Sequence, residues 1–228
     1  MQRTSNYEEA ISWSKELGIV GKVAAAWIPS VGFEFATKNS DGSISLTRDG
    51  FGLGLGPNPI IEPSWSRFAI SKSVPKELTR DYLLVNRWNP YFIETKNISS
   101  TSAAEKFDEV GIKEFLDENA PNSSTYPGND EVQFWAGIKV AGELVAVGCL
   151  AKWESGSYII SSIATKVSER GKGYGRQITQ AIVAFAAQMG IAEVFLAVNA
   201  KNEIAARVYE GIGFISLGQF NTFEKSEN

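Results

Sequence analysis

The sequence predicts an α+β protein whose larger, C-terminal part is a mixed, mostly antiparallel sheet flanked by helices. Three patterns predict this class: a run of three strands, a long amphipathic helix, and a second strand–helix pair. A tight turn around Gly142 joins the first two strands and makes them antiparallel. In chain order, the expected segments are strands at residues 132–140, 144–153 and 158–165, a helix at 174–189, a strand at 193–198, a helix at 202–211 and a strand that begins at 213.

The N-terminal residues predict a smaller α+β part with less regular elements. Ser5 and Glu8 form a capping box, which predicts an opening helix. A short helix is expected after Pro75. The glycine-rich segment 50–57 is followed by prolines, so we interpret it as a loop or an irregular strand. The strand-like runs lie at residues 23–28, 31–36, 44–46, 68–70 and 88–95.

A change of composition predicts where the two parts meet. Residues 96–102 are rich in Asn, Ser and Thr, which is typical of a connection that ends in a helix cap. A helix is expected over residues 103–118. We therefore divide the chain of 228 residues into an N-terminal α+β extension at 1–90 and a C-terminal domain at 91–228.

The composition excludes several classes of chemistry. The chain has no histidine and one cysteine, Cys149, so it cannot build a Ser-His-Asp triad, a zinc finger or an intramolecular disulfide, and no metal site is expected. Cys149 lies in an apolar run and is interpreted as a small buried hydrophobe. The net charge of -4 gives no general attraction to nucleic acid or to membrane surfaces. With no apolar leader or span, the protein is predicted to be cytoplasmic.

One glycine-rich segment carries the clearest chemical signal. Residues 168–175 follow a predicted strand, open a predicted helix, and contain Arg170, Gly171, Lys172, Gly173, Tyr174 and Gly175. Closely spaced glycines at a helix N-terminus let backbone N–H groups converge on an anion such as a diphosphate. The order of residues excludes a Walker A loop, because Lys172 precedes a glycine, and it does not fit G-x-G-x-x-G.

Two motifs together resemble the GNAT superfamily of acyl-CoA-dependent N-acyltransferases. Arg170, Gly173 and Gly175 match the family's R-x-x-G-x-G pyrophosphate loop. Residues 202–214 match its N-x-x-A-x-x-x-Y-x-x-x-G-F signature, which begins at Asn202 and includes Tyr209. The resemblance covers about residues 131–223 and extends more loosely back to residue 91. It implies a GNAT-type sheet and an N-terminal extension that is a degenerate GNAT-like half with no cofactor site of its own.

The resemblance also implies roles for individual residues. Acetyl-CoA would lie along the backbone of the approaching strand, at Ile163, Ala164, Thr165 and Val167, and its diphosphate on the glycine loop. Asn202 would contact the cofactor arm, and Tyr209, two helical turns on, would be the general acid for the departing sulfur. A backbone N–H near Val167 would stabilise the oxyanion. Many relatives place a carboxylate on this strand, where the chain has Ser161 and Ser162, so a water relay to Glu154 or Glu131 is the hypothesis for the base.

The predicted function is transfer of an acetyl group from acetyl-CoA to a primary amine of an acceptor that the sequence does not identify. Two alternatives stay open: a non-catalytic acyl-CoA-binding or regulatory module, and a transferase that uses a longer acyl-CoA or a protein N-terminus. The acceptor pocket is expected near residues 122–128, and the extension is expected to complete or cover it. Its candidate walls are Trp88, Tyr91, Trp135 and Trp153.

Overall fold

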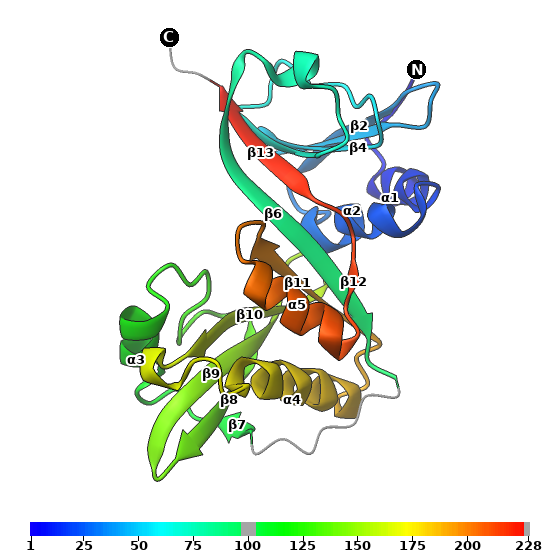
Figure 1. Ribbon diagram of the computed structural model, residues 1–228. Helices are drawn as coiled ribbons and strands as arrows, with labels where there is room; N and C mark the ends of the chain where they lie inside the picture. Colours follow the sequence, from blue (N-terminus) through cyan, green and yellow to red (C-terminus); the bar gives the residue numbers. More distant parts are fainter. Residues whose placement is uncertain (97–103, 226–228) are drawn as a thin grey trace.

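The computed structural model describes residues 1–96 and 104–225, and within them the strands form one continuous sheet. The fold class is α+β, as predicted, and most neighbouring strands are antiparallel. The path through the sheet is β1-β2-β3-β4-β5-β13-β6-β11-β10-β9-β8-β7, with β12 paired to β6 beside that path. Figure 1 shows the N-terminal elements at one end of this sheet and the later strands at the other.

The N-terminal part pairs its strands in chain order and covers them with short helices. The two parallel neighbours are β4 and β5. The strands are β1 (Gln2–Thr4), β2 (Phe33–Lys38), β3 (Ile44–Arg48), β4 (Phe51–Leu55) and β5 (Arg67–Ser71). The helices are α1 (Tyr7–Lys15), η1 (Gly18–Gly21), α2 (Lys22–Trp27) and η2 (Lys76–Thr79).

Two sequence predictions in this part were wrong. Residues 23–28 were expected to be a strand, yet Lys22–Trp27 form helix α2 with Val23, Ala24 and Ala26 buried. Three alanines give this segment a high helix propensity, and the burial of one helix face decides the outcome. Helix α1 is capped by Asn6, whose side chain accepts the Glu9 N–H at 3.0 Å, instead of by the predicted Ser5–Glu8 box. The first helix itself is confirmed.

The C-terminal part confirms the predicted strand and helix order, with two exceptions. One last strand was expected to begin at residue 213, but Gly213 caps helix α5 and two strands, β12 and β13, follow it. A helix was expected over residues 103–118, but Glu105–Phe107 form the edge strand β7, and α3 (Ile112–Asn119) begins only after Gly111. Gly111 has φ 76°, a left-handed conformation that interrupts a helix. Residues 97–102 of the predicted connection, and residue 103 of that helix, lie outside the described residues. The remaining elements are β8 (Val132–Val140), β9 (Glu143–Lys152), β10 (Tyr158–Thr165), η3 (Val167–Glu169), α4 (Tyr174–Gln188), β11 (Glu193–Asn199), α5 (Glu203–Ile212), β12 (Ile215–Ser216) and β13 (Phe220–Lys225).

The long strand β6 (Tyr82–Glu94) joins the two parts of the sheet. Its later residues pair with β11, from Trp88↔Asn199 to Glu94↔Glu193, and its earlier residues pair with β13. Strand β13, the last in the chain, in turn pairs with β5 of the N-terminal part. The N-terminal strands are thus completed by β13, and the C-terminal strands by β6. Strands β6 and β13 run side by side across the middle of the molecule (Figure 1). The predicted division at residue 90 falls within β6 and stays a prediction.

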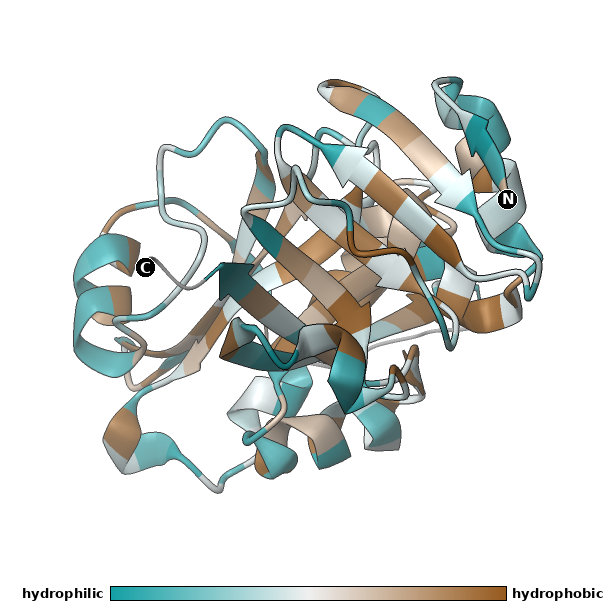
Figure 2. Ribbon diagram, turned by 90° about the horizontal axis from the view of Figure 1, so that it is seen from above, coloured by the Kyte–Doolittle hydropathy of each residue, from teal (hydrophilic) through white to brown (hydrophobic). Residues whose placement is uncertain are grey.

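The two faces of the sheet carry different helices. Successive residues of a strand point to opposite faces. Ile160 and Leu196 belong to the core formed with α4 and α5, whereas Ile159 and Phe195 belong to the core formed with α1 and α2. Apolar residues accordingly gather along the strands, and polar ones on the outer sides of the helices (Figure 2). Within residues 1–96 and 104–225, no helix is long and apolar enough to cross a membrane.

Candidate active site

The two central parallel strands separate at one point, and a cleft opens there. The register between β10 and β11 gives a single pair, Ile159↔Phe195. Beyond it, β10 has a register shift against β9 between Ser161 and Ala164, and Ser162 adopts φ 52°. This is a β-bulge, which bends a strand and leaves a residue outside the regular ladder. The bulge directs β10 away from β11.

The cleft has a volume of about 660 Å³ and collects several predicted residues. It is lined by β10, β11, the segment after α3 and the start and middle of α5. Ile163, predicted from the strand before the glycine loop, and Asn202 and Tyr209, predicted from the second signature, all line it. Residues 122–124, expected near an acceptor pocket, line it as well. Ala164 and Thr165 end β10 beyond the cleft, and Val167 begins η3 just before the glycine loop.

Tyr209 is a buried phenol beside open space. It is 8% exposed, and its ring lies 6.2 Å from that of Tyr91 and 5.9 Å from that of Phe214. Burial, followed by interaction with Tyr91, raises the pKa of Tyr209 to about 12, so the phenol stays protonated at neutral pH. Among the described residues, no hydrogen bond from its hydroxyl is found. The neighbouring Tyr91 hydroxyl instead donates to Glu210 at 3.1 Å.

Asn202 has a structural role in addition to its place in the cleft. It is the N-cap of α5, and its Oδ1 accepts the N–H of Ala205 at 3.1 Å. The cap sets where α5 begins, and Tyr209 follows two turns later on the same side of the helix. Asn202 therefore sets the position at which α5 begins, and α5 in turn places Tyr209 at the cleft.

The glycine loop has the backbone conformation that an anion site requires. Gly171 and Gly173 have φ 80° and 85°, and a Cβ on either would meet no atom within 4 Å. Gly173 is the N-cap of α4 and provides no side-chain cap, so the first N–H groups of this 15-residue helix receive no hydrogen bond from their cap residue. A Cβ on Gly175 would lie 3.6 Å from Thr165 Oγ1, so the helix start lies close against the end of β10.

The two predicted cations of the loop are engaged with the protein. The Arg170 guanidinium donates to the carbonyl oxygen of Asn119 at 2.8 Å and to that of Thr165 at 3.3 Å. Lys172 forms a 2.9 Å ion pair with Glu169, which raises the pKa of the lysine. Arg170 therefore fastens the loop to α3 and β10, and the backbone presents most of the surface to an anion.

Asn119, at the end of α3, contributes to the site but was not predicted from the sequence. Its Oδ1 accepts the N–H of Val167 at 3.0 Å, and its Nδ2 donates to the carbonyl oxygen of Phe115 at 2.9 Å. The Val167 N–H was expected to stabilise an oxyanion, yet it is bonded within the protein and lies after β10. The bulge that interrupts β10 lies earlier, at Ser162 and Ile163, beside the cleft.

Hydroxyl groups from the segment after α3 hold the bulge. The Ser162 side chain donates to the carbonyl oxygen of Thr125 at 2.7 Å and accepts the Thr125 N–H at 3.2 Å. The Thr125 hydroxyl donates to Ser161 Oγ at 2.9 Å, and Ser124 Oγ lies 2.9 Å from the same atom. A non-glycine residue at positive φ costs free energy and persists only where its surroundings fix it. These bonds fix Ser162.

A family model now decides the class of protein. The acetyltransferase (GNAT) family matches residues 96–214, which is more than half of the chain and includes the glycine loop, Asn202 and Tyr209. The chain belongs to the GNAT acetyltransferase family. Enzymes of this family transfer acyl groups, and the predicted resemblance is confirmed.

Solved structures of GNAT proteins share the fold at low sequence identity. A GCN5-related N-acetyltransferase from Kribbella flavida superimposes with a TM-score of 0.58 at 13% identity, covering 96% of each chain. An acetyltransferase of the GNAT family from Colwellia psychrerythraea gives 0.55 at 12%, covering 99% of this chain and 100% of its own. A GCN5-related N-acetyltransferase from Sphaerobacter thermophilus gives 0.58 at 15%, covering 84% and 79%. A search of curated proteins finds no match to the sequence.

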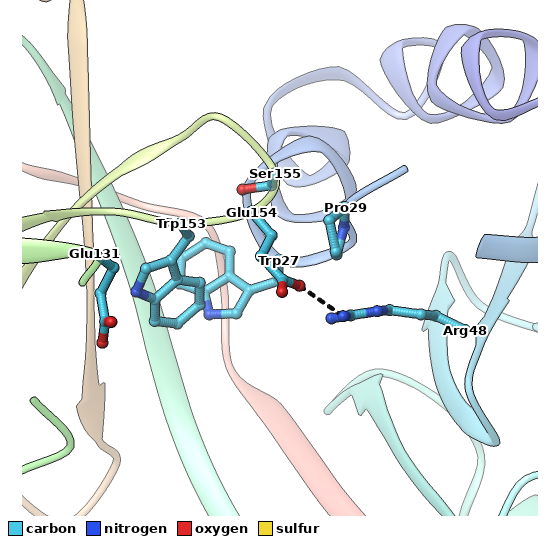
Figure 3. Close-up of a pocket in the computed structure, with 7 residues that line it drawn as sticks. All are labelled: Trp27, Pro29, Arg48, Glu131, Trp153, Glu154 and Ser155. Atoms are coloured by element: carbon cyan, nitrogen blue, oxygen red, sulfur yellow. Dashed lines mark hydrogen bonds and ion pairs between the residues drawn. The ribbon is translucent and has the colours of Figure 1, made fainter. Parts of the chain in front are cut away.

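A second cavity of about 350 Å³ adjoins this GNAT cleft. Trp153 lines both cavities. The two carboxylates considered as proton acceptors, Glu131 and Glu154, line the second one, together with Trp27. Figure 3 shows Trp153 between Glu131 on one side and the Arg48–Glu154 ion pair on the other.

The other expected walls of an acceptor pocket lie in the packed cores. Trp135 is 1% exposed in the core beneath α3, and Tyr91 is 2% exposed beside Tyr209. Trp88 stacks on Phe220, with ring centroids 5.1 Å apart. Of the four aromatic residues named from the sequence, Trp153 is the one that lines these cavities. Trp27, which the sequence placed in a strand, is the aromatic wall that was missed.

Proposed function

We propose that this GNAT protein transfers an acetyl group from acetyl-CoA to a primary amine. The observation that carries the proposal is the position of Tyr209, whose protonated phenol lines a cleft at the point where β10 and β11 separate. The glycine loop at the end of the same strand supplies an anion site for the donor. The glycine loop for the diphosphate, the open edge of β10 and the phenol of Tyr209 therefore follow one another along β10 and the cleft.

The residues of the path fit the chemical groups of acetyl-CoA in order. The N–H groups at the start of α4, between Gly171 and Gly175, suit the diphosphate because the helix dipole is positive there. The edge of β10 from Ile163 to Thr165 has no regular pairing with β11, so its backbone can pair with the amides of the pantetheine arm. The thioester would then lie near the bulge and Tyr209.

The reaction requires a nucleophile, an oxyanion donor and a proton for sulfur. A neutral amine attacks the thioester carbonyl, a C–N bond forms, and the C–S bond breaks. We assign stabilisation of the oxyanion to the backbone at the Ser162–Ile163 bulge, because the Val167 N–H is already bonded to Asn119. Positioning of the two substrates in one cleft supplies much of the rate.

Tyr209 acts on the leaving sulfur as a hydrogen-bond donor and proton relay. Its pKa of about 12 lies roughly 3 to 4 units above that of an ordinary thiol. Complete transfer of the phenolic proton to a thiolate would therefore be uphill by about 5 kcal/mol. The proton that finally resides on sulfur comes from the attacking amine. Until it arrives, the Tyr209 phenol stabilises the negative charge of the thiolate by a hydrogen bond.

The hydroxyls of Thr125, Ser161 and Ser124 offer a route for the proton that the acceptor ammonium loses before attack. Serine and threonine are not bases at neutral pH, so the route must end on a carboxylate or on water. We propose that water in the cleft carries that proton from the hydroxyls to solvent.

Calorimetric titration with acetyl-CoA tests the donor site. The intact protein is expected to bind at micromolar strength, about -8 kcal/mol. The variant Gly173→Glu places a carboxylate at the start of α4 and should abolish binding. Gly142→Glu is the matched control, because Gly142 also has positive φ and open space around it but lies in the distant β8–β9 turn. Equal binding by the two variants would contradict the loop assignment.

A further inference from the structure

The second cavity is built by both parts of the chain and held rigidly. Trp27 and Pro29 come from the end of α2 and the residues after it, and Arg48 ends β3, whereas Trp153 and Glu154 follow β9. Ser155 Oγ donates to the carbonyl oxygen of Ala26 at 2.8 Å, and Arg48 pairs with Glu154 at 2.6 Å. These bonds fasten the β9–β10 turn to α2 and to the end of β3.

The cavity lies on the opposite face of the sheet from Tyr209. Trp27 and Trp153 pack against the core of α1 and α2, together with Ile159 and Phe195. Tyr209 belongs to the core of α4 and α5. The cleft between β10 and β11 reaches both faces, since it is lined by Tyr209 and by Trp153. A molecule in the second cavity can therefore reach a thioester that enters from the other face.

The walls of the second cavity select a cation. The indole rings of Trp27 and Trp153 have centroids 6.1 Å apart at 87°, and tryptophan is the best aromatic partner for an ammonium group. Arg48 offsets the charge of Glu154, as the dashed line in Figure 3 shows, but no ion pair of Glu131 is found among the described residues. Two indoles and one uncompensated carboxylate favour one positive charge.

The cation in this cavity cannot be the nitrogen that reacts. An amine must be neutral to attack a thioester, whereas Glu131 and the indole faces favour a charged one. We infer that the second cavity, lined by Trp27, Trp153 and Glu131, binds the ammonium end of a small diamine or polyamine whose other amine is acetylated. The inference rests on the proposed function and names the substrate class of that same site. A cavity of about 350 Å³ is of the size that holds small molecules.

Binding of cadaverine and spermidine to the full chain, followed by tryptophan fluorescence and calorimetry without acetyl-CoA, tests the inference. 1-Pentanol is the matched probe, of similar length but without a cation. The diamine or the polyamine should bind at least about tenfold more tightly than 1-pentanol, which corresponds to about 1.4 kcal/mol. Equal affinities of all three probes would overturn the inference, and this comparison needs no variant that has to fold.

Variants locate the site on the protein. Glu131→Gln, which keeps the shape of the side chain, and Trp27→Phe should each weaken cadaverine binding about tenfold. Glu8→Gln removes an equal charge from an exposed position on α1 and should leave binding unchanged. Loss of binding in Glu8→Gln to the same extent as in Glu131→Gln would show only a general charge effect and would overturn the assignment.

The two proposals fail in different ways. Diamine binding that depends on Glu131, with no acetyl transfer to any amine, would support the ammonium site in the second cavity and contradict the proposed acetyl-transfer function. Acetyl transfer to pentylamine or to a peptide N-terminus at the same kcat/KM as to cadaverine would support the acetyl-transfer function and overturn the proposed ammonium site.

Discussion

Tyr209 shows how one residue can be fixed by packing and still be available for chemistry. The rings of Tyr91 and Phe214 pack against it, and the residue also lines the cleft. We expect Tyr209→Phe to lower kcat for acetyl transfer about 100-fold, because the charge on the departing sulfur loses its donor. The Kd for acetyl-CoA should change less than about twofold, because the other donor contacts are backbone groups.

The pH dependence of that variant separates two roles for the phenol. The pKa of about 12 keeps Tyr209 protonated throughout the pH range of an acetyl-transfer assay. The alkaline limb of kcat/KM should therefore have the same midpoint in the wild type and in Tyr209→Phe. Steady-state rates over pH check this, and a shifted midpoint in the variant would show that Tyr209 itself titrates during turnover.

At the scale of elements, α3 and the glycine loop are coupled through Asn119. This side chain is 6% exposed and holds the Val167 N–H, while its carbonyl oxygen accepts from Arg170. Asn119→Ala leaves the Val167 N–H without its partner, and we expect a loss of about 2 kcal/mol in the free energy of unfolding. Acetyl-CoA binding should weaken about tenfold, because the loop that presents the N–H groups of α4 loses its support.

Urea denaturation and calorimetry measure both effects. Lys172→Ala is the control within the same loop, since its ion pair with Glu169 is at the surface and contributes little. It should leave the free energy of unfolding unchanged within the error of the measurement. If Asn119→Ala binds acetyl-CoA as the wild type does, the loop holds its shape without α3.

The elements differ in how well the sequence predicts them. Strands β8, β9 and β10 and helix α4 have clear periodicity and were predicted closely. The helix α2 was missed because a run such as Val23–Trp27 is apolar in either conformation, and tertiary packing decides between them. Strand β4 was read as a loop or an irregular strand because of its glycines. Gly52 is required there by a neighbour remote in sequence, since a Cβ would lie 2.0 Å from the Trp65 ring.

The residues of the candidate site also differ in how well the sequence predicts them. Asn202 and Tyr209 belong to one helix, so their spacing could be read from the sequence. Asn119, Trp27 and the bulge at Ser162 reach the site through the folding of distant segments, and no local pattern marks them. A bulge depends on the register of two strands, which a single strand does not reveal.

At the scale of the whole molecule, the pairing of β13 with β6 and β5 ties the C-terminal strand to the N-terminal part. A chain limited to residues 91–228 lacks the part of β6 that pairs with β13 and lacks β5 altogether. Phe220 and Phe223, which are 0% and 7% exposed, would then lose their cover. We expect this fragment to aggregate or to unfold without cooperativity, whereas the full chain melts in one transition. A fragment 81–228 keeps β6 and is the control.

Thermal circular dichroism and size-exclusion chromatography distinguish these outcomes. The fragment 81–228 should contain more folded protein than 91–228, because β13 regains one of its two partners. A soluble fragment 91–228 with a sharp melting transition would show that the C-terminal domain is independent of the N-terminal residues, and that the predicted division at residue 90 is also a boundary of folding.

The stability of the whole molecule should fall in alkali because two buried acids resist ionisation. Burial raises the pKa of Cys149 from 9.0 to about 12 and that of Tyr209 from 10.0 to about 12. Below pH 9 both groups are protonated in the folded and unfolded states, so their contribution is complete. Between pH 9 and 12 the unfolded chain loses these protons first, and the free energy of unfolding therefore decreases.

Cys149→Ala isolates the thiol's share of this decrease. At pH 10.5 the thiol accounts for about 2 kcal/mol, since each unit of pKa difference corresponds to about 1.4 kcal/mol. The variant loses some stability at every pH because it leaves a small cavity in the core beneath α3. Between pH 7.5 and 10.5, however, it should lose about 2 kcal/mol less than the wild type in urea denaturation. Equal losses would mean that the core around Cys149 admits water, and that the strand carrying Ser161, whose carbonyl oxygen accepts the thiol proton, is looser than its hydrogen bonds indicate.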